Sequence, residues 1–153
     1  MSERHRSVSG FSALELLLVA AVGAIVAVMA VPSLQSVQEG LRLQTAGISM
    51  ASKVAEARTN ALKRNRWTWI LCDATTRTAQ VQTISNGTML NVGAREFLPR
   101  GVTFKLDGAP TTMITFDSMG RPLIAPQTLV LQHTRSGYMR TITVASTGRI
   151  SVK

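Results

Sequence analysis

Gly10-Phe11-Ser12-Ala13-Leu14-Glu15 opens an apolar stretch that continues to Val31 and is followed by Pro32-Ser33. Residues 16–38 contain no Asp, Glu, Lys or Arg. As a helix rising about 1.5 Å per residue, residues 11–31 would be about 31 Å long, close to the hydrocarbon thickness of a bilayer. The sequence therefore predicts a transmembrane helix over residues 11–33.

The residues before this stretch set the expected topology. Residues 1–10 are polar and include Arg4 and Arg6, and positive charge before a span keeps that end in the cytoplasm. A secretory signal would end its apolar run at a small-residue cleavage site, whereas here the run continues through Pro32. We expect the segment to be retained, with the C-terminal part across the membrane.

Glu15 is the one charged residue within the apolar stretch. A carboxylate in such a helix costs a few kcal/mol unless it is neutralised or paired, so such residues are functional by default. The alternative is that Glu15 lies at the cytoplasmic edge of the span, near helix N-terminal amides, and extends to water.

Residues 10–15, the apolar run and Pro32-Ser33 together resemble the class III signal of type IV pilins and type II secretion pseudopilins. The resemblance implies a leader peptide over residues 1–10, cut by prepilin peptidase between Gly10 and Phe11, and N-methylation of Phe11. It implies that Glu15 pairs with the N-terminal ammonium of a neighbouring subunit during assembly. A missing partner would leave a buried charge costing about 3–5 kcal/mol. Pro32 is expected to bend the helix or to unwind it locally.

Residues 34–66 predict an amphipathic continuation of the same helix. Apolar residues recur with the helical period and would pack on a sheet; they are Leu34, Val37, Leu41, Ile48, Ala51, Val54, Ala55, Ala61 and Leu62. Gly40 and Gly47 each weaken the helix by about 1 kcal/mol. The end of the segment is basic, which complements the helix dipole. The stretch Glu56-Ala-Arg-Thr-Asn-Ala-Leu-Lys-Arg-Asn65, followed by Trp69-Ile-Leu-Cys72 at a strand, resembles the helix end of GspH/FimT-type minor pilins and pseudopilins.

Residues 67–153 predict an antiparallel β-sheet domain. Short alternating runs indicate strands at residues 67–72, 78–84, 88–92, 102–106, 113–116, 128–132 and 138–144. Asn86-Gly87 is typical of a type I′ hairpin. Two similar turns, Ser118-Met-Gly120-Arg121 and Ser146-Thr-Gly148-Arg149, each follow a strand. The expected fold class is α+β, with the helix on one face of one sheet, in agreement with a pilin-like fold.

Composition restricts the chemistry of the chain. A single cysteine, Cys72, excludes an internal disulfide and a cysteine-built zinc site, and two histidines make a histidine-rich metal site hard to assemble. Asp73, Asp107, Asp117 and His133 match no catalytic spacing, and Cys72 fits a buried strand position. We therefore expect no enzyme activity, metal or cofactor.

The resemblance implies a structural subunit near the tip of a type IV pilus or type II secretion pseudopilus. Its partners would be prepilin peptidase, other pilin or pseudopilin subunits, the inner-membrane assembly platform and membrane lipid. The subunit would cross the bacterial inner membrane once, with its C-terminal domain in the periplasm, and then enter the filament.

An alternative is a DNA-binding FimT-like minor pilin acting in natural transformation. The chain has 17 Lys and Arg against 8 Asp and Glu, a net charge of +9, and such charge suits nucleic acid, anionic lipid or an acidic partner. FimT-type proteins carry a C-terminal Gly-Arg-x-Arg element. Here Gly148-Arg149 is followed by Ile150-Ser151, so the second arginine is missing. Candidate DNA-binding residues are Arg135, Arg140, Arg149 and Lys153, and the competing interpretation is a solvated basic surface.

Overall fold

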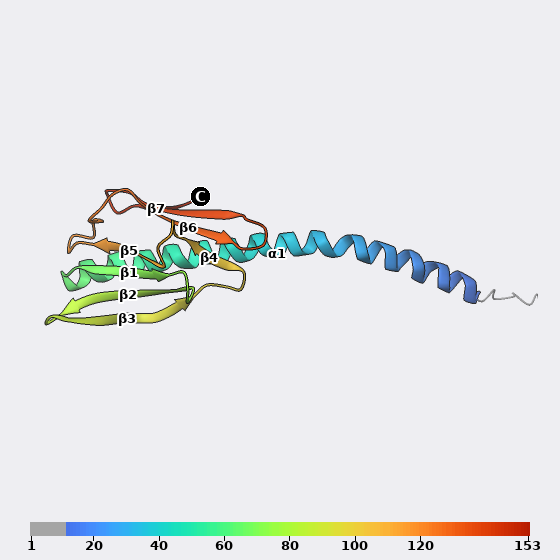
Figure 1. Ribbon diagram of the computed structural model, residues 1–153, viewed down its shortest axis with the longest axis horizontal. Helices are drawn as coiled ribbons and strands as arrows, with labels where there is room; N and C mark the ends of the chain where they lie inside the picture. Colours follow the sequence, from blue (N-terminus) through green and yellow to red (C-terminus); the bar gives the residue numbers. More distant parts are fainter. Residues whose placement is uncertain (1–11) are drawn as a thin grey trace, which may run out of the picture. The chain divides into compact units, whose positions relative to one another are not determined.

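A computed structural model describes residues 12–153, without the side chains of residues 29–33 (Figure 1). The predictions for Gly10 and Phe11 lie outside the described residues. The chain divides into two compact units, Met1–Val37 and Gln38–Lys153. Each unit is described below by itself.

A single helix, α1 (Ala13–Arg64), forms the N-terminal part of the described chain. Ser12 caps its start, since its Oγ accepts a hydrogen bond from the Leu14 N–H at 3.2 Å. Asn65 ends the helix in a left-handed conformation, with φ 50°. The backbone remains helical at Pro32, and the bend expected there stays a prediction.

In the first unit, α1 exposes apolar side chains on all sides. Large apolar residues between Leu14 and Val28 are 54–75% exposed, and at 3.6 residues per turn their positions surround the helix axis. A helix that is apolar all round requires a nonaqueous or protein environment. Over the part of the chain that the structure describes, no helix meets the combined length and hydropathy of a membrane span.

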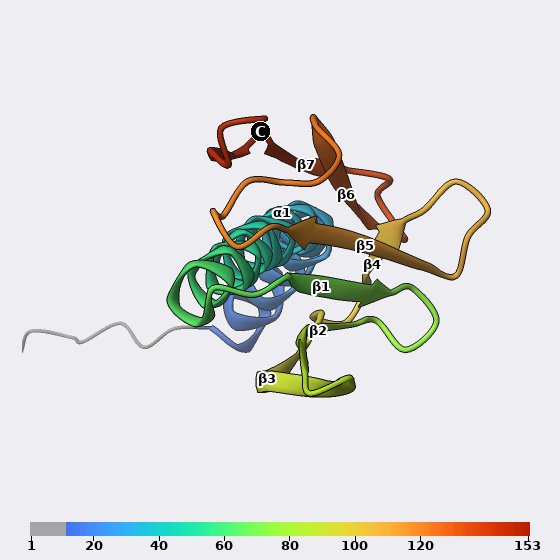
Figure 2. The same cartoon turned by 90° about the vertical axis from the view of Figure 1, so that its left-hand side faces the viewer.

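The second unit contains two four-stranded antiparallel sheets, with strand orders β3-β2-β1-β5 and β4-β6-β7-β8. Figure 2 shows both sheets beside the C-terminal half of α1. The strands are β1 (Thr68–Asp73), β2 (Thr78–Ser85), β3 (Thr88–Phe97), β4 (Val102–Lys105), β5 (Thr111–Phe116), β6 (Gln127–His133), β7 (Met139–Val144) and β8 (Ile150–Val152).

The fold class is confirmed, and three details of the sequence prediction are corrected. The domain has two sheets rather than one, because β5 returns to pair with β1 while β4 pairs with β6. The short strand β8 was missed, and β3 extends beyond Val92 to Phe97. The hairpin at Asn86-Gly87 is confirmed, with φ of 51° and 76°.

The helix stripe that packs on the sheets differs from the predicted one. The buried residues follow a 3–4 spacing; they are Leu43, Ala46, Met50, Val54, Ala57 and Ala61. Of the predicted stripe, Leu34, Val37, Leu41, Ile48 and Leu62 are 49–62% exposed. Val54 and Ala61 of the predicted stripe are buried, and Ala51 packs partly buried against the core. The large residues of the predicted stripe other than Val54 are exposed, and three of the six buried positions are alanines, which let the sheets approach closely.

Gly47 also allows a strand to approach α1 closely. It is buried, and a Cβ built on it would lie 3.4 Å from Val152 Cγ1 on β8. The glycine lowers the stability of the helix, but its missing side chain leaves room for the edge strand of the second sheet.

Candidate functional site

The first candidate site is the start of α1, at Ser12 and Glu15. The Ser12 carbonyl accepts hydrogen bonds from the Glu15 and Leu16 N–H groups at 3.0 and 3.2 Å. Glu15 is exposed in this first turn, three residues after the cap, at the spacing of a capping box. A carboxylate there faces the positive end of the helix dipole and is accessible to a partner. The cap at Ser12 is a feature that the sequence analysis missed.

Arg58 holds the two similar Gly-Arg turns against α1. Its Nε donates to the Gly120 carbonyl at 3.0 Å and its Nη2 to the Thr147 carbonyl at 3.3 Å. A Cβ on Gly120 would lie 2.9 Å from Leu62 Cγ, and one on Gly148 would lie 2.7 Å from both Arg58 Nε and the Gly120 oxygen. Both glycines also have positive φ. The two turns therefore need glycine because they meet each other and the helix.

This arrangement gives the Gly148-Arg149 pair a structural role. Gly148 is buried against Arg58, whereas Arg149 is exposed, and its carbonyl accepts a hydrogen bond from Ala145 at 2.9 Å. The role of Arg58 could not be read from the sequence, where it was one of several cations near a helix end. The repeated Ser-x-Gly-Arg turns were visible in the sequence, but nothing in them specified a contact with Arg58.

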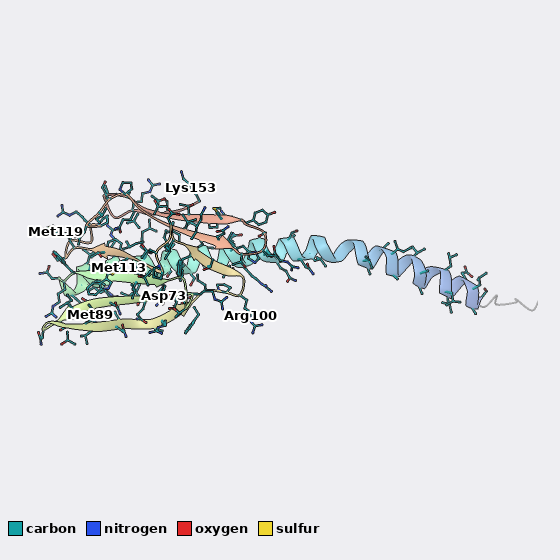
Figure 3. All side chains as sticks on the ribbon, in the orientation of Figure 1. Asp73, Met89, Arg100, Met113, Met119 and Lys153 are labelled. Atoms are coloured by element: carbon teal, nitrogen blue, oxygen red, sulfur yellow. The ribbon has the colours of Figure 1, made fainter. Side chains whose placement is uncertain are left out.

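The structure does not gather the four candidate DNA-binding residues at one place. Arg149 lies opposite Ala145 at the end of β7, and Lys153 pairs with Thr141 at its start. At about 3.4 Å per residue, the four-residue separation along the strand corresponds to about 14 Å. Figure 3 labels Lys153 at the chain end.

The other two candidates lie toward the start of β7. Arg135 is exposed in the turn between β6 and β7. Arg140 is half-buried, and its Cβ lies 3.8 Å from the Cβ position of Gly47, so its stem packs against α1. The backbones of Arg140 and Lys153 are therefore close, but their side chains lie on opposite faces of the sheet, because Lys153 pairs with Thr141, the neighbour of Arg140. Arg149 is separated from both residues along the strand.

Three of the residues considered for catalysis have structural roles, and a fourth, Asp107, is exposed. Cys72 is fully buried, and burial raises the pKa of its thiol to about 12. Asp73 caps its turn by accepting from the Thr76 and Thr75 N–H groups, which lowers the pKa of its carboxyl. Asp117 accepts from the Arg121 and Met119 N–H groups, with the same effect on its pKa.

His133 is also structural. It is buried at the end of β6, and its Nδ1 lies 3.0 Å from Ser136 Oγ and 3.7 Å from Glu39 Oε2. Both neighbours approach the same ring nitrogen, so the three residues do not form the relay of a hydrolase triad. Among the described residues, no three His, Cys, Asp or Glu side chains converge on a metal position.

The sequence of the folded domain decides the family. Residues 46–148 match the family described as "Type II transport protein GspH". The chain belongs to this family. No curated protein sequence matches the chain.

Solved structures of other proteins share the fold of this chain. The minor pseudopilin EpsH of the Vibrio cholerae Type 2 Secretion System superposes with a TM-score of 0.59 at 15% identity, covering 73% of this chain and 96% of EpsH. The Pseudomonas aeruginosa type IV minor pilin FimU superposes with a TM-score of 0.59 at 18% identity, covering 75% of this chain and 90% of FimU. The pilin-like fold of this GspH-family chain is therefore confirmed.

Proposed function

We propose that the chain is a structural subunit, a minor pilin or H-type pseudopilin, that assembles near the tip of a pilus or pseudopilus. One observation carries the proposal: a GspH-family domain continues from a helix whose first half exposes apolar side chains all round. Such a helix is stable in lipid or among other helices, and a filament subunit encounters both. The role requires no catalytic step.

The anchor of the subunit is residues 11–33, crossing the bacterial inner membrane once. Arg4 and Arg6 favour a cytoplasmic N-terminus, and residues 16–38 carry no charge that would oppose insertion. The folded domain then lies in the periplasm. Membrane lipid surrounds the anchor before the subunit enters the filament.

Prepilin peptidase removes residues 1–10 and methylates the new amine of Phe11. Glu15 then pairs with the N-terminal ammonium of a neighbouring subunit. This pairing is supported by the exposed position of Glu15 in the first turn of α1 and by the Ser12 cap, which keeps that turn helical. Two charges that would each be costly in a low-dielectric environment thereby compensate one another.

The second half of α1 supplies a further contact to neighbouring subunits. In the second unit, Leu41 and Ile48 are 57% and 60% exposed, while the opposite stripe packs on the sheets. Leu34 and Val37 are similarly exposed in the first unit. Helices of adjacent subunits, recruited by the inner-membrane assembly platform, would cover these side chains.

Copurification from detergent-solubilised membranes tests the assembly role. The wild-type chain should copurify with other pilin-like subunits of its cell. Glu15→Ala should be processed normally, but the amount of these subunits that copurifies with it should fall about tenfold. Val19→Ala on the same helix is the control and should copurify as the wild type does. Equal recovery of Glu15→Ala and the wild type would contradict the charge pairing.

DNA capture is a second candidate function, supported by the exposed cations Arg135, Arg149 and Lys153 and the net charge of +9. Phosphate contacts would make such binding independent of sequence and sensitive to salt. Gel shifts with the double variant Arg149→Ala/Lys153→Ala test it. Unchanged shifts would remove these two residues from a DNA site, and a lost shift with unchanged folding would support one.

A further inference from the structure

The outer face of the first sheet contains an apolar groove. Its volume is about 450 Å³, and no charged side chain lines it. The lining residues come from four strands, from the segment before β1 and from the loop after β5; they are Trp67, Trp69, Leu71, Gln82, Met89, Met113, Thr115 and Leu123. We refer to this surface as the Trp67 groove.

The alternation of β1 explains why these side chains face outward. Ile70 and Cys72 are fully buried toward the core, so Trp69 and Leu71 lie on the opposite face of the strand. The register then places Gln82 and Thr115 beside Trp69, and Met113 beside Leu71. The groove is therefore a continuous surface that crosses the sheet.

The large apolar side chains of the Trp67 groove are unusually exposed for the outer face of a sheet. The solvent side of an antiparallel sheet normally alternates to polar residues, yet Trp67 is 57%, Met89 69% and Met113 55% exposed. Figure 3 labels both methionines on the sheet. Contiguous exposed apolar surface marks an interaction site, and methionine and tryptophan are favoured at such surfaces.

Cations surround the groove. Arg66 precedes Trp67 and donates to Ser85 Oγ at 2.7 Å, at the end of β2. Arg95 lines a polar hollow that shares Leu71 and Gln82 with the groove. Arg121 lies two residues before Leu123 and is exposed.

The nearby carboxylates offset only part of this charge. Asp73 is ionised, because the N–H groups of its own turn lower the pKa of its carboxyl, and it lines the same hollow as Arg95. Asp117 pairs with Arg121 at 3.2 Å, so the three arginines Arg66, Arg95 and Arg121 exceed these two carboxylates by one positive charge. An occupant should therefore combine an apolar centre with negative charge at its border.

We propose that the Trp67 groove binds an apolar segment of a different protein, flanked by Asp or Glu residues. The inference concerns the folded domain and does not depend on leader cleavage. A second copy of this chain is disfavoured because it would bring a second positive rim against the first. Single-stranded DNA is disfavoured because, of the two rings in the lining, Trp69 is only 8% exposed and one open ring is a poor stacking platform.

Photocrosslinking in the cells that make the protein tests the proposal on the full chain. The photoreactive amino acid benzoylphenylalanine replaces Trp67 or Met89. Tyr138 serves as the control position because it is 54% exposed in the loop between β6 and β7 of the other sheet. After irradiation, the crosslinked peptide is identified by mass spectrometry. The N-terminus of the same sample is sequenced, so that a failure of processing is distinguished from a failure of the groove.

We expect positions 67 and 89 to crosslink to one protein, through a peptide whose apolar residues are bordered by Asp or Glu, and position 138 not to do so. Arg66→Glu/Arg95→Glu should reduce the product about tenfold, and reversing the partner's acidic residues should restore it. Crosslinks to a second copy, to lipid or to DNA would each overturn the proposal. So would no product, an equal product at position 138, or a product insensitive to the charge reversal.

Discussion

Replacing Gly148 with alanine should destabilise the folded domain more than replacing any glycine that has positive φ but open surroundings. At φ 80°, a non-glycine residue costs about 1–2 kcal/mol in the left-handed region. The new Cβ would also lie 2.7 Å from Arg58 Nε and from the Gly120 carbonyl oxygen, so the turn must move away from the helix. Losing hydrogen bonds from the Arg58 guanidinium adds about 1.5–3 kcal/mol. The expected total is about 3–5 kcal/mol of unfolding free energy.

Gly108→Ala is the matched control. Gly108 has φ 84°, and its Cβ position has no heavy atom within 4 Å. It should therefore cost only the conformational term, about 1–2 kcal/mol. The difference between the two variants isolates the contact with Arg58.

The assay is urea unfolding of the full-length protein in a mild detergent, followed by the fluorescence of Trp67 and Trp69. Both tryptophans report on β1 and its surroundings. Equal losses for Gly148→Ala and Gly108→Ala would refute the role of Arg58 in holding the two turns together. A loss near 1 kcal/mol for both would point to backbone conformation alone.

Three further outcomes are expected from the same protein. In urea unfolding, Met50→Ala should lower the unfolding free energy by about 2–5 kcal/mol because Met50 is fully buried. Ile48→Ala should lower it by about 0.5 kcal/mol or less because Ile48 is 60% exposed. The reverse order would mean that Ile48, as the sequence predicted, packs on the sheets and Met50 does not. Cys72 should resist maleimide labelling at neutral pH, because its raised pKa and burial leave no accessible thiolate, and should react after unfolding; rapid labelling of the folded chain would contradict its position. The hydrogen bonds lower the pKa of the Asp117 carboxyl from 3.8, so the carboxylate stabilises the fold above that pH and loses this effect as pH falls through the folded pKa. The difference in unfolding free energy between the wild type and Asp117→Asn should therefore shrink below pH 3.8. A difference independent of pH would contradict the role of Asp117 in capping its turn.

The sequence predicted the elements whose signals are local. The helix end near Asn65, the positions of seven strands and the hairpin at Asn86-Gly87 follow from periodicity and turn chemistry over a few residues. Residues 10–15 carry the family resemblance in the same way, because the order of residue types around Glu15 is itself the motif.

The remaining features depend on contacts between distant residues. Leu41 and Leu43 are equally apolar, and only the packing of the sheets decides that Leu43 is buried. The split into two sheets arises from the pairing of β5 with β1, which no local pattern specifies. Arg58 meets Gly120 and Thr147 only after both turns have folded onto α1. The Trp67 groove likewise exists only once four strands are in register.

The central claim, that the chain is a processed pilin-class subunit, is tested most directly at its N-terminus. The protein should be produced with and without a prepilin peptidase, and its intact mass and N-terminal sequence determined. The account predicts a chain that begins at N-methylated Phe11 when the peptidase is present and at Met1 when it is absent. An N-terminus at Met1 in both samples would contradict the account and leave Glu15 without its proposed partner.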